Sequence, residues 1–93
     1  MEIKHSDNGS KGSFRAFENG AEAGIISYTW HDEHTFIIEH TIGKPEFKGV
    51  GTVLLNAAVD FARQKGVKII PVCSFAKRMF EKRPEINDVL AGA

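Results

Sequence analysis

The sequence has little of several things that would each point to a particular class of protein. Cys73 is the only cysteine among the 93 residues, so no internal disulfide can form, and a reducing compartment fits this usage. Lysine plus arginine and aspartate plus glutamate each total 12, which gives a net charge of zero. A chain with neither a basic excess nor an acidic tail lacks the electrostatic signature of a nucleic-acid or basic-protein partner.

Long apolar runs are missing too. No stretch approaches the ~20 apolar residues that a membrane-spanning helix needs. Met1 is followed by Glu2 and Lys4 rather than by the apolar core of a secretory signal. We therefore expect a cytoplasmic protein with no membrane partner. What is present is ordinary for one globular domain, since 42% of the residues are apolar and 26% are charged.

The first third of the chain alternates strand formers with turn residues. We expect short strands around Ile3, over Phe14–Glu18 and over Glu22–Trp30. Asn19-Gly20, between the last two, is a strong signal for a two-residue hairpin turn. The next turn, HDEH at His31–His34, has side chains that bind metals. A solvated loop is the commoner role of such a turn, and we predict no metal site.

The stretch that organises the rest runs from Thr35 to Lys65 and has the pattern strand, loop, helix. Phe36–Ile38 is a short apolar strand, and Lys44-Pro45 ends it because proline cannot donate to a ladder. Thr52 is the expected cap of the helix and Gly66 is its C-terminal stop. Apolar residues at helical spacing predict a buried stripe of Leu54, Ala57, Ala58, Phe61 and Ala62.

Gly49 and Gly51 precede this helix. A strand that feeds a helix through a glycine loop directs several free N–H groups and the positive end of the helix dipole to one place. That arrangement suits a phosphate or pyrophosphate. The plain alternative is that the glycines serve only a tight turn.

The remaining chain predicts a strand over Val67–Val72 and a helix over Cys73–Lys82, with Ser74 as its candidate cap. Pro84 ends that helix and opens a last helical turn over Glu85–Leu90. The order is an antiparallel N-terminal meander followed by β-α-β-α. A helix between the last two strands makes them parallel through a right-handed crossover. We therefore expect an α/β (α+β) fold with a small mixed sheet and one parallel strand pair.

The two parallel strands would end at a common edge of the sheet, where open α/β folds bind ligands. His40 lies at the end of the first strand and Cys73 lies just past the end of the second. Cys73 would also stand at a helix N-terminus, which favours thiolate over thiol. A thiolate beside an imidazole makes a nucleophile with its base. The alternative is a buried cysteine that packs as a small apolar residue and a histidine bonded to the backbone.

Three segments resemble the GNAT (Gcn5-related N-acetyltransferase) superfamily, and within it the compact bacterial group described as YjdJ-like. They are IIEHT at Ile37–Thr41, PEFKGVGTVLLNAAVDFARQKG at Pro45–Gly66 and VCSFAKRMFEKRPEINDVL at Val72–Leu90. The third is the most specific, because a cysteine-led helix that ends at a proline is particular to that group. The resemblance implies one GNAT-like acyltransferase domain over residues 1–93. Its implied activity is acetyl-CoA-dependent N-acetyl transfer to an amine that the sequence does not identify.

The resemblance also implies the site. Main-chain N–H groups of the Pro45–Thr52 loop would hold the pyrophosphate of acetyl-CoA or coenzyme A, and the backbone around Thr41 and Ile42 would pair with the pantetheine arm. Relatives carry a histidine and a cysteine where His40 and Cys73 stand, and a catalytic role has been proposed for them. In ordinary members the amine attacks the thioester directly, whereas a cysteine there would permit transfer through the enzyme. The expected cofactor-binding residues are Thr41, Ile42, Phe47, Lys48, Gly49, Val50, Gly51 and Thr52.

The loop departs from the family pattern. That pattern is Arg or Gln, any two residues, Gly, any residue, then Gly or Ala. Counting back from Gly49, the first place holds Glu46, or else the loop is shorter than in typical relatives. A negative Glu46 near the phosphates would oppose binding. The alternative function is therefore a non-catalytic module on the same scaffold that binds acyl-CoA or a protein. A third is a redox domain that uses Cys73 alone.

Overall fold

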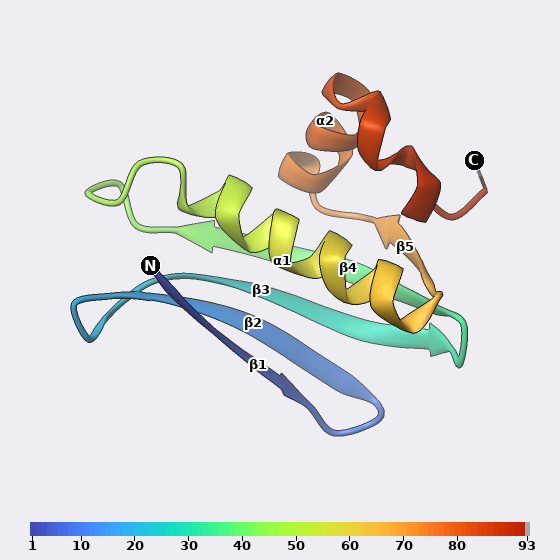
Figure 1. Ribbon diagram of the computed structural model, residues 1–93, viewed down its shortest axis with the longest axis horizontal. Coiled ribbons are helices and arrows are strands. Elements are labelled where there is room, and N and C mark those ends of the chain that lie inside the picture. Colours follow the sequence, from blue (N-terminus) through green and yellow to red (C-terminus); the bar gives the residue numbers. More distant parts are fainter. Residues whose placement is uncertain (93) are drawn as a thin grey trace.

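A computed structural model describes residues 1–92 (Figure 1). Five strands form one sheet in the order β1-β2-β3-β4-β5. The elements are β1 (Glu2–Asp7), β2 (Lys11–Glu18), β3 (Ala21–Asp32), β4 (Thr35–Gly43), α1 (Val50–Lys65), β5 (Lys68–Pro71), α2 (Ser74–Lys82) and the 3₁₀ helix η1 (Pro84–Val89). Strands β1 to β4 pair antiparallel, whereas β4 and β5 pair in parallel. The predicted mixed sheet with one parallel pair is confirmed.

The hairpin between β2 and β3 forms where the sequence predicted it. Asn19 and Gly20 both have positive φ, at 52° and 83°, as a tight two-residue turn requires. The strands are longer than their apolar stretches, because β3 continues past Trp30 to Asp32 and β4 continues past Ile38 to Gly43. These polar ends remain in the strands because β3 and β4 pair with each other there.

Both ends of α1 are set by a glycine in the left-handed conformation. Gly49, with φ of 80°, is the N-cap and has no side chain to offer to the first turn. Thr52 lies inside that turn, so the predicted threonine cap is wrong. The chain enters the helix through a positive φ, which glycine adopts without strain. Gly66 ends the helix as predicted, with its N–H directed at the carbonyls of Ala62 and Arg63.

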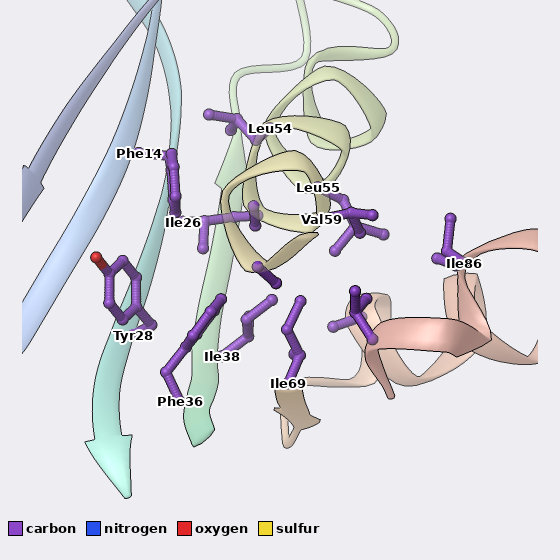
Figure 2. Close-up of a cluster of buried hydrophobic side chains, with 14 of the residues drawn as sticks. Phe14, Ile26, Tyr28, Phe36, Ile38, Leu54, Leu55, Val59, Ile69 and Ile86 are labelled. Atoms are coloured by element: carbon purple, nitrogen blue, oxygen red, sulfur yellow. The ribbon is translucent and has the colours of Figure 1, made fainter. Parts of the chain in front are cut away.

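The core lies between α1 and the sheet (Figure 2). Of the predicted stripe, Leu54, Ala58 and Ala62 are fully buried, while Ala57 and Phe61 are partly buried against the core. The buried face of α1 is wider than predicted, because Leu55 and Val59 are buried as well. Figure 2 shows these two side chains between α1 and the segment that carries Ile86.

The C-terminal elements α2 and η1 stand on the β5 side of the sheet, away from β1 (Figure 1). Each helix contributes to the core, through Ala76 and Phe80 from α2 and through Ile86 and Val89 from η1. After η1 the chain returns to the sheet, where Leu90 forms a parallel bridge with Ile69. No helix within residues 1–92 is long and apolar enough to cross a membrane.

Strand β4 contains a bulge. Tyr28 of β3 pairs with Ile38, but the neighbouring Ser27 pairs with His40, which leaves Glu39 as the extra residue. A bulge of this kind shifts the alternation of side chains by one position.

The bulge decides which side chains of β4 face α1. Phe36 and Ile38 are buried under the helix, so regular alternation would place His40 on the same face. Instead, Thr41 lies opposite the buried Ile26 and takes the α1 face, and His40 takes the other face.

Candidate functional site

The predicted common edge of β4 and β5 exists, but the two strands end at different levels. Their parallel register stops at Ile38 and Pro71, while β4 continues to Gly43. The N–H groups of Val72 and Cys73 both donate to the Ile38 carbonyl, where the chain turns away. Among the residues that the structure describes, no strand pairs with this edge of β4 beyond Ile38. The stretch 39–43 thus offers main-chain groups to an extended ligand.

The N-terminus of α1 lies beside the end of β4 and is open. The first hydrogen bond of the helix runs from the Val53 N–H to the Gly49 carbonyl, at 3.2 Å. The N–H groups of Val50, Gly51 and Thr52 therefore have no partner within the helix. No side chain caps the helix and no acidic residue lies in its first turn. This is the arrangement that binds phosphate groups.

A hollow of about 290 Å³ lies at this helix end. Among the expected cofactor residues, its lining includes Thr41, Phe47, Lys48, Gly49, Val50, Gly51 and Thr52. The other expected residue, Ile42, does not line the hollow and its side chain is 61% exposed. Ile42 pairs with Ile25 on the far face of the sheet, so only its backbone can take part.

The charges around the hollow favour an anionic ligand more than the sequence suggested. Lys44 and Lys48 both line it, whereas Glu46 is exposed and is not part of the lining. Two ammonium groups near three free N–H groups favour a dianionic ligand. In the sequence, Lys44 was interpreted only as a residue that ends the strand, so it was not predicted as a site residue.

Phe75 is a site residue that the sequence did not reveal. It comes from the first turn of α2 and lines the hollow. Its ring lies against Gly51, where a Cβ atom would come within 2.8 Å of the Phe75 Cζ. This contact joins two helices that are distant in sequence, so no local pattern predicts it.

Cys73 is the N-cap of α2. Its backbone is extended, and its Sγ accepts the Ala76 N–H at 3.4 Å. The predicted cap, Ser74, therefore lies within the first turn. The half-buried Cys73 thiol also lies 3.3 Å from the Thr41 Oγ1. The sulfur is thus on the α1 face of the sheet, next to the hollow that Thr41 lines.

His40 lies on the opposite face from Thr41 and is exposed. The structure thus brings Thr41, rather than His40, against the thiol. His40 is nevertheless the preceding residue of the same open stretch of β4. A catalytic pair of Cys73 and His40 stays a prediction.

A larger hollow of about 630 Å³ lies at the other end of α1, with Trp30, Phe61 and Lys65 in its lining. At ~1.5 Å of rise per residue, α1 separates Lys65 from Gly51 by roughly 20 Å. No helix N-terminus lines this hollow, and it is separate from the hollow at the N-terminus of α1.

A hydrogen-bond network borders the larger hollow. The Asp7 carboxylate accepts from the Tyr28 hydroxyl at 2.5 Å and from the Trp30 indole at 2.9 Å. Partial burial acts to raise the pKa of Asp7, but these bonds and one from the Gly9 N–H outweigh it and hold that pKa below its usual value. Burial, and then the Asp7 carboxylate, raise the pKa of the Tyr28 phenol. The network fixes the end of the sheet.

A hydrogen bond between a side chain and the backbone holds the HDEH turn. The Asp32 carboxylate accepts the His34 N–H at 2.8 Å. Within residues 1–92, no three histidine, cysteine, aspartate or glutamate side chains gather closely enough to hold a metal ion.

The model of the GCN5-related N-acetyl-transferase family matches residues 13–89. The chain belongs to this family. A GCN5-like protein from Staphylococcus aureus, solved by NMR, is 40% identical to this acetyltransferase-family chain, with a TM-score of 0.74 over 99% of this chain and 89% of that one. The predicted family membership is confirmed.

Two less similar solved structures share the fold. AAC(6')-Iy, solved with the bisubstrate analogue CoA-S-monomethyl-acetylneamine, is 18% identical, with a TM-score of 0.59 over 89% of this chain and 62% of that one. PseH from Campylobacter jejuni, solved with acetyl coenzyme A, is 20% identical, with a TM-score of 0.57 over 87% of this chain and 56% of that one. A search of curated proteins finds no match.

Proposed function

We propose that this GCN5-related chain transfers an acetyl group from acetyl-CoA to an amine. The observation that carries the proposal is the open N-terminus of α1, flanked by Lys44 and Lys48, at the end of an unpaired stretch of β4. Membership of the family supports acyl transfer as the class of reaction. PseH and AAC(6')-Iy, which hold acetyl-CoA and a CoA analogue, support the cofactor.

The geometry suggests where each part of acetyl-CoA would lie. The pyrophosphate would accept the N–H groups of Gly49 to Thr52, with the ammonium groups of Lys44 and Lys48 beside it. The pantetheine arm would then run along the open edge of β4, past Ile42 and Thr41 toward Ile38. An arm on that path brings the thioester toward Cys73, because the thiol lies against Thr41.

We assign the chemistry to the two sides of this edge. Cys73 would approach the thioester from the α1 side as its thiolate: Sγ attacks the carbonyl carbon, the bond to the CoA sulfur breaks, and CoA leaves as its own thiolate. His40 stands on the opposite face, which is open to solvent. An amine that arrives there would attack the Cys73 thioester, give its proton to the His40 imidazole and release the cysteine thiolate.

The cofactor site can be tested by titrating the protein with coenzyme A while following backbone amide shifts. We expect the largest shifts at Gly49, Gly51 and Thr52. Lys44→Ala and Lys48→Ala should each weaken coenzyme A several-fold, while leaving the affinity for pantetheine, which has no phosphate, unchanged. Lys11→Ala, in distant β2, is the matched control. Unshifted amides at millimolar coenzyme A would refute the site.

The covalent step needs a second experiment. After incubation with acetyl-CoA and no amine, mass spectrometry should find an acetyl group on Cys73 and none on the Cys73→Ser variant. Full turnover by Cys73→Ala with a panel of amines would replace this route with direct attack. Binding of coenzyme A without turnover of any amine would favour the non-catalytic module instead.

A further inference from the structure

Thr41 has separate uses for its backbone and its side chain. Its backbone belongs to the open edge of β4, whereas its hydroxyl lies 3.3 Å from the Cys73 Sγ, with either atom able to donate. The bulge at Glu39 produces this contact, because regular alternation would have turned Thr41 to the far face of the sheet.

The sulfur of Cys73 is already an acceptor. It receives the Ala76 N–H at the start of the nine-residue helix α2. Within residues 1–92, Thr41 and this N–H are its hydrogen-bond partners. The titratable side chains next to this pair in the sequence are His40, which precedes Thr41, and Lys77, which follows Cys73 in α2. Both are exposed, and His40 lies on the opposite face of β4.

The Thr41 hydroxyl distinguishes the two states of the thiol. A neutral thiol is a weak donor, so its bond to the Thr41 oxygen is weak. A thiolate only accepts, and an O–H that donates to it makes a stronger, charge-assisted bond. The hydroxyl can rotate to make either bond. Either bond fixes the direction of Sγ, and only the bond to a thiolate is charge-assisted.

We propose that Thr41 is a positioning residue that activates Cys73. It touches no reacting atom of the acyl donor and acts through the sulfur. The inference rests on the proposed function for the use made of Cys73, but its effect on the thiol is present without any ligand.

The test compares variants at position 41 in the intact chain. Thr41→Val keeps the branched shape and removes the hydroxyl, while Thr41→Ser keeps the hydroxyl. We expect iodoacetamide to alkylate Cys73 about tenfold more slowly in Thr41→Val at neutral pH and at nearly the wild-type rate in Thr41→Ser. The pH at which alkylation is half-maximal should rise in the valine variant. Thr35→Val, in the same strand, is the control and should change neither quantity.

Two outcomes would overturn the proposal. One is alkylation of Thr41→Val at the wild-type rate with the wild-type pH profile. The other is equal slowing in the serine and valine variants, which would make the contact a matter of packing. The proposed function fails separately, since wild-type protein that does not bind coenzyme A would refute it while leaving the alkylation result in place.

Discussion

Gly51 allows a stability effect to be separated from a binding effect. In a Gly51→Ala variant the new Cβ would lie 2.8 Å from the Phe75 Cζ and 3.2 Å from its two Cε atoms. Carbon atoms in contact keep ~3.5–4 Å between them, so the ring must move by roughly 0.5–1 Å. Phe75 is half-buried at the rim of the hollow and can turn into it.

The two effects of Gly51→Ala on the free energy of unfolding oppose each other, whereas its two effects on coenzyme A binding act in the same direction. Alanine in place of glycine within a helix gains up to ~1 kcal/mol, while overpacking costs ~1–3 kcal/mol. Because the Phe75 ring can move into open space, we take the low end of that cost. The free energy of unfolding should therefore fall by only about 0–1 kcal/mol. The displaced ring and the methyl group fill the space beside the free N–H groups, so coenzyme A should bind about tenfold more weakly, or ~1.4 kcal/mol.

Urea unfolding and calorimetric titration with coenzyme A would measure both effects. The double variant Gly51→Ala with Phe75→Ala relieves the clash and should recover part of the lost affinity, with a coupling energy of about 1 kcal/mol. Gly49→Ala is the control for stability. Its Cβ meets no atom within 4 Å, but its φ of 80° should cost about 1–2 kcal/mol. A Gly51→Ala variant that is stabilised by the full propensity gain and binds coenzyme A normally would refute the reasoning.

Two further predictions concern stability. Tyr28→Phe removes the hydroxyl that donates to Asp7 and lies 2.6 Å from the His5 Nε2, so the free energy of unfolding should fall by about 2 kcal/mol. The pKa of Asp7 is lowered in the folded protein, so this difference should be complete above about pH 5 and shrink progressively below about pH 4 as the carboxylate takes up its proton. Urea unfolding at several pH values that shows a constant difference would contradict this. Gly66→Ala should cost about 1 kcal/mol at a φ of 71°, and an unchanged melting temperature would count against the helix-stop role of this glycine.

The features that the sequence predicted correctly are those that local chemistry decides. Asn19-Gly20 gave the hairpin and Gly66 the end of α1, because only a few residue types tolerate positive φ. The parallel pair also followed, since a helix between two neighbouring strands leaves no other arrangement. The glycine loop before α1 was also predicted, because Gly49 adopts the positive φ that glycine tolerates.

The parts that were missed depend on contacts between distant segments. No glycine or proline at Glu39 predicts the bulge, which arises from how β3 and β4 pair. The common end of the two parallel strands pointed to His40 as the neighbour of Cys73, whereas the bulge places the Thr41 side chain there. Phe75 joined the site through its packing on Gly51. Contacts between segments that are distant in the sequence decided the positions of both Thr41 and Phe75, and a single sequence does not reveal such contacts.

The return of Leu90 to β5 has a consequence for the molecule in concentrated solution. Exposed strand edges can recruit other chains and grow into aggregates. On the β5 side, the bridge to Ile69 and the Ala91 N–H bonded to the Ile69 carbonyl occupy part of that edge. On the other side, β1 exposes Glu2 and Lys4, charges that discourage a neighbour from docking. The sheet is thereby protected along β5 by the chain itself and along β1 by charge, which leaves residues 39–43 of β4 as the stretch of edge that is open to another extended chain.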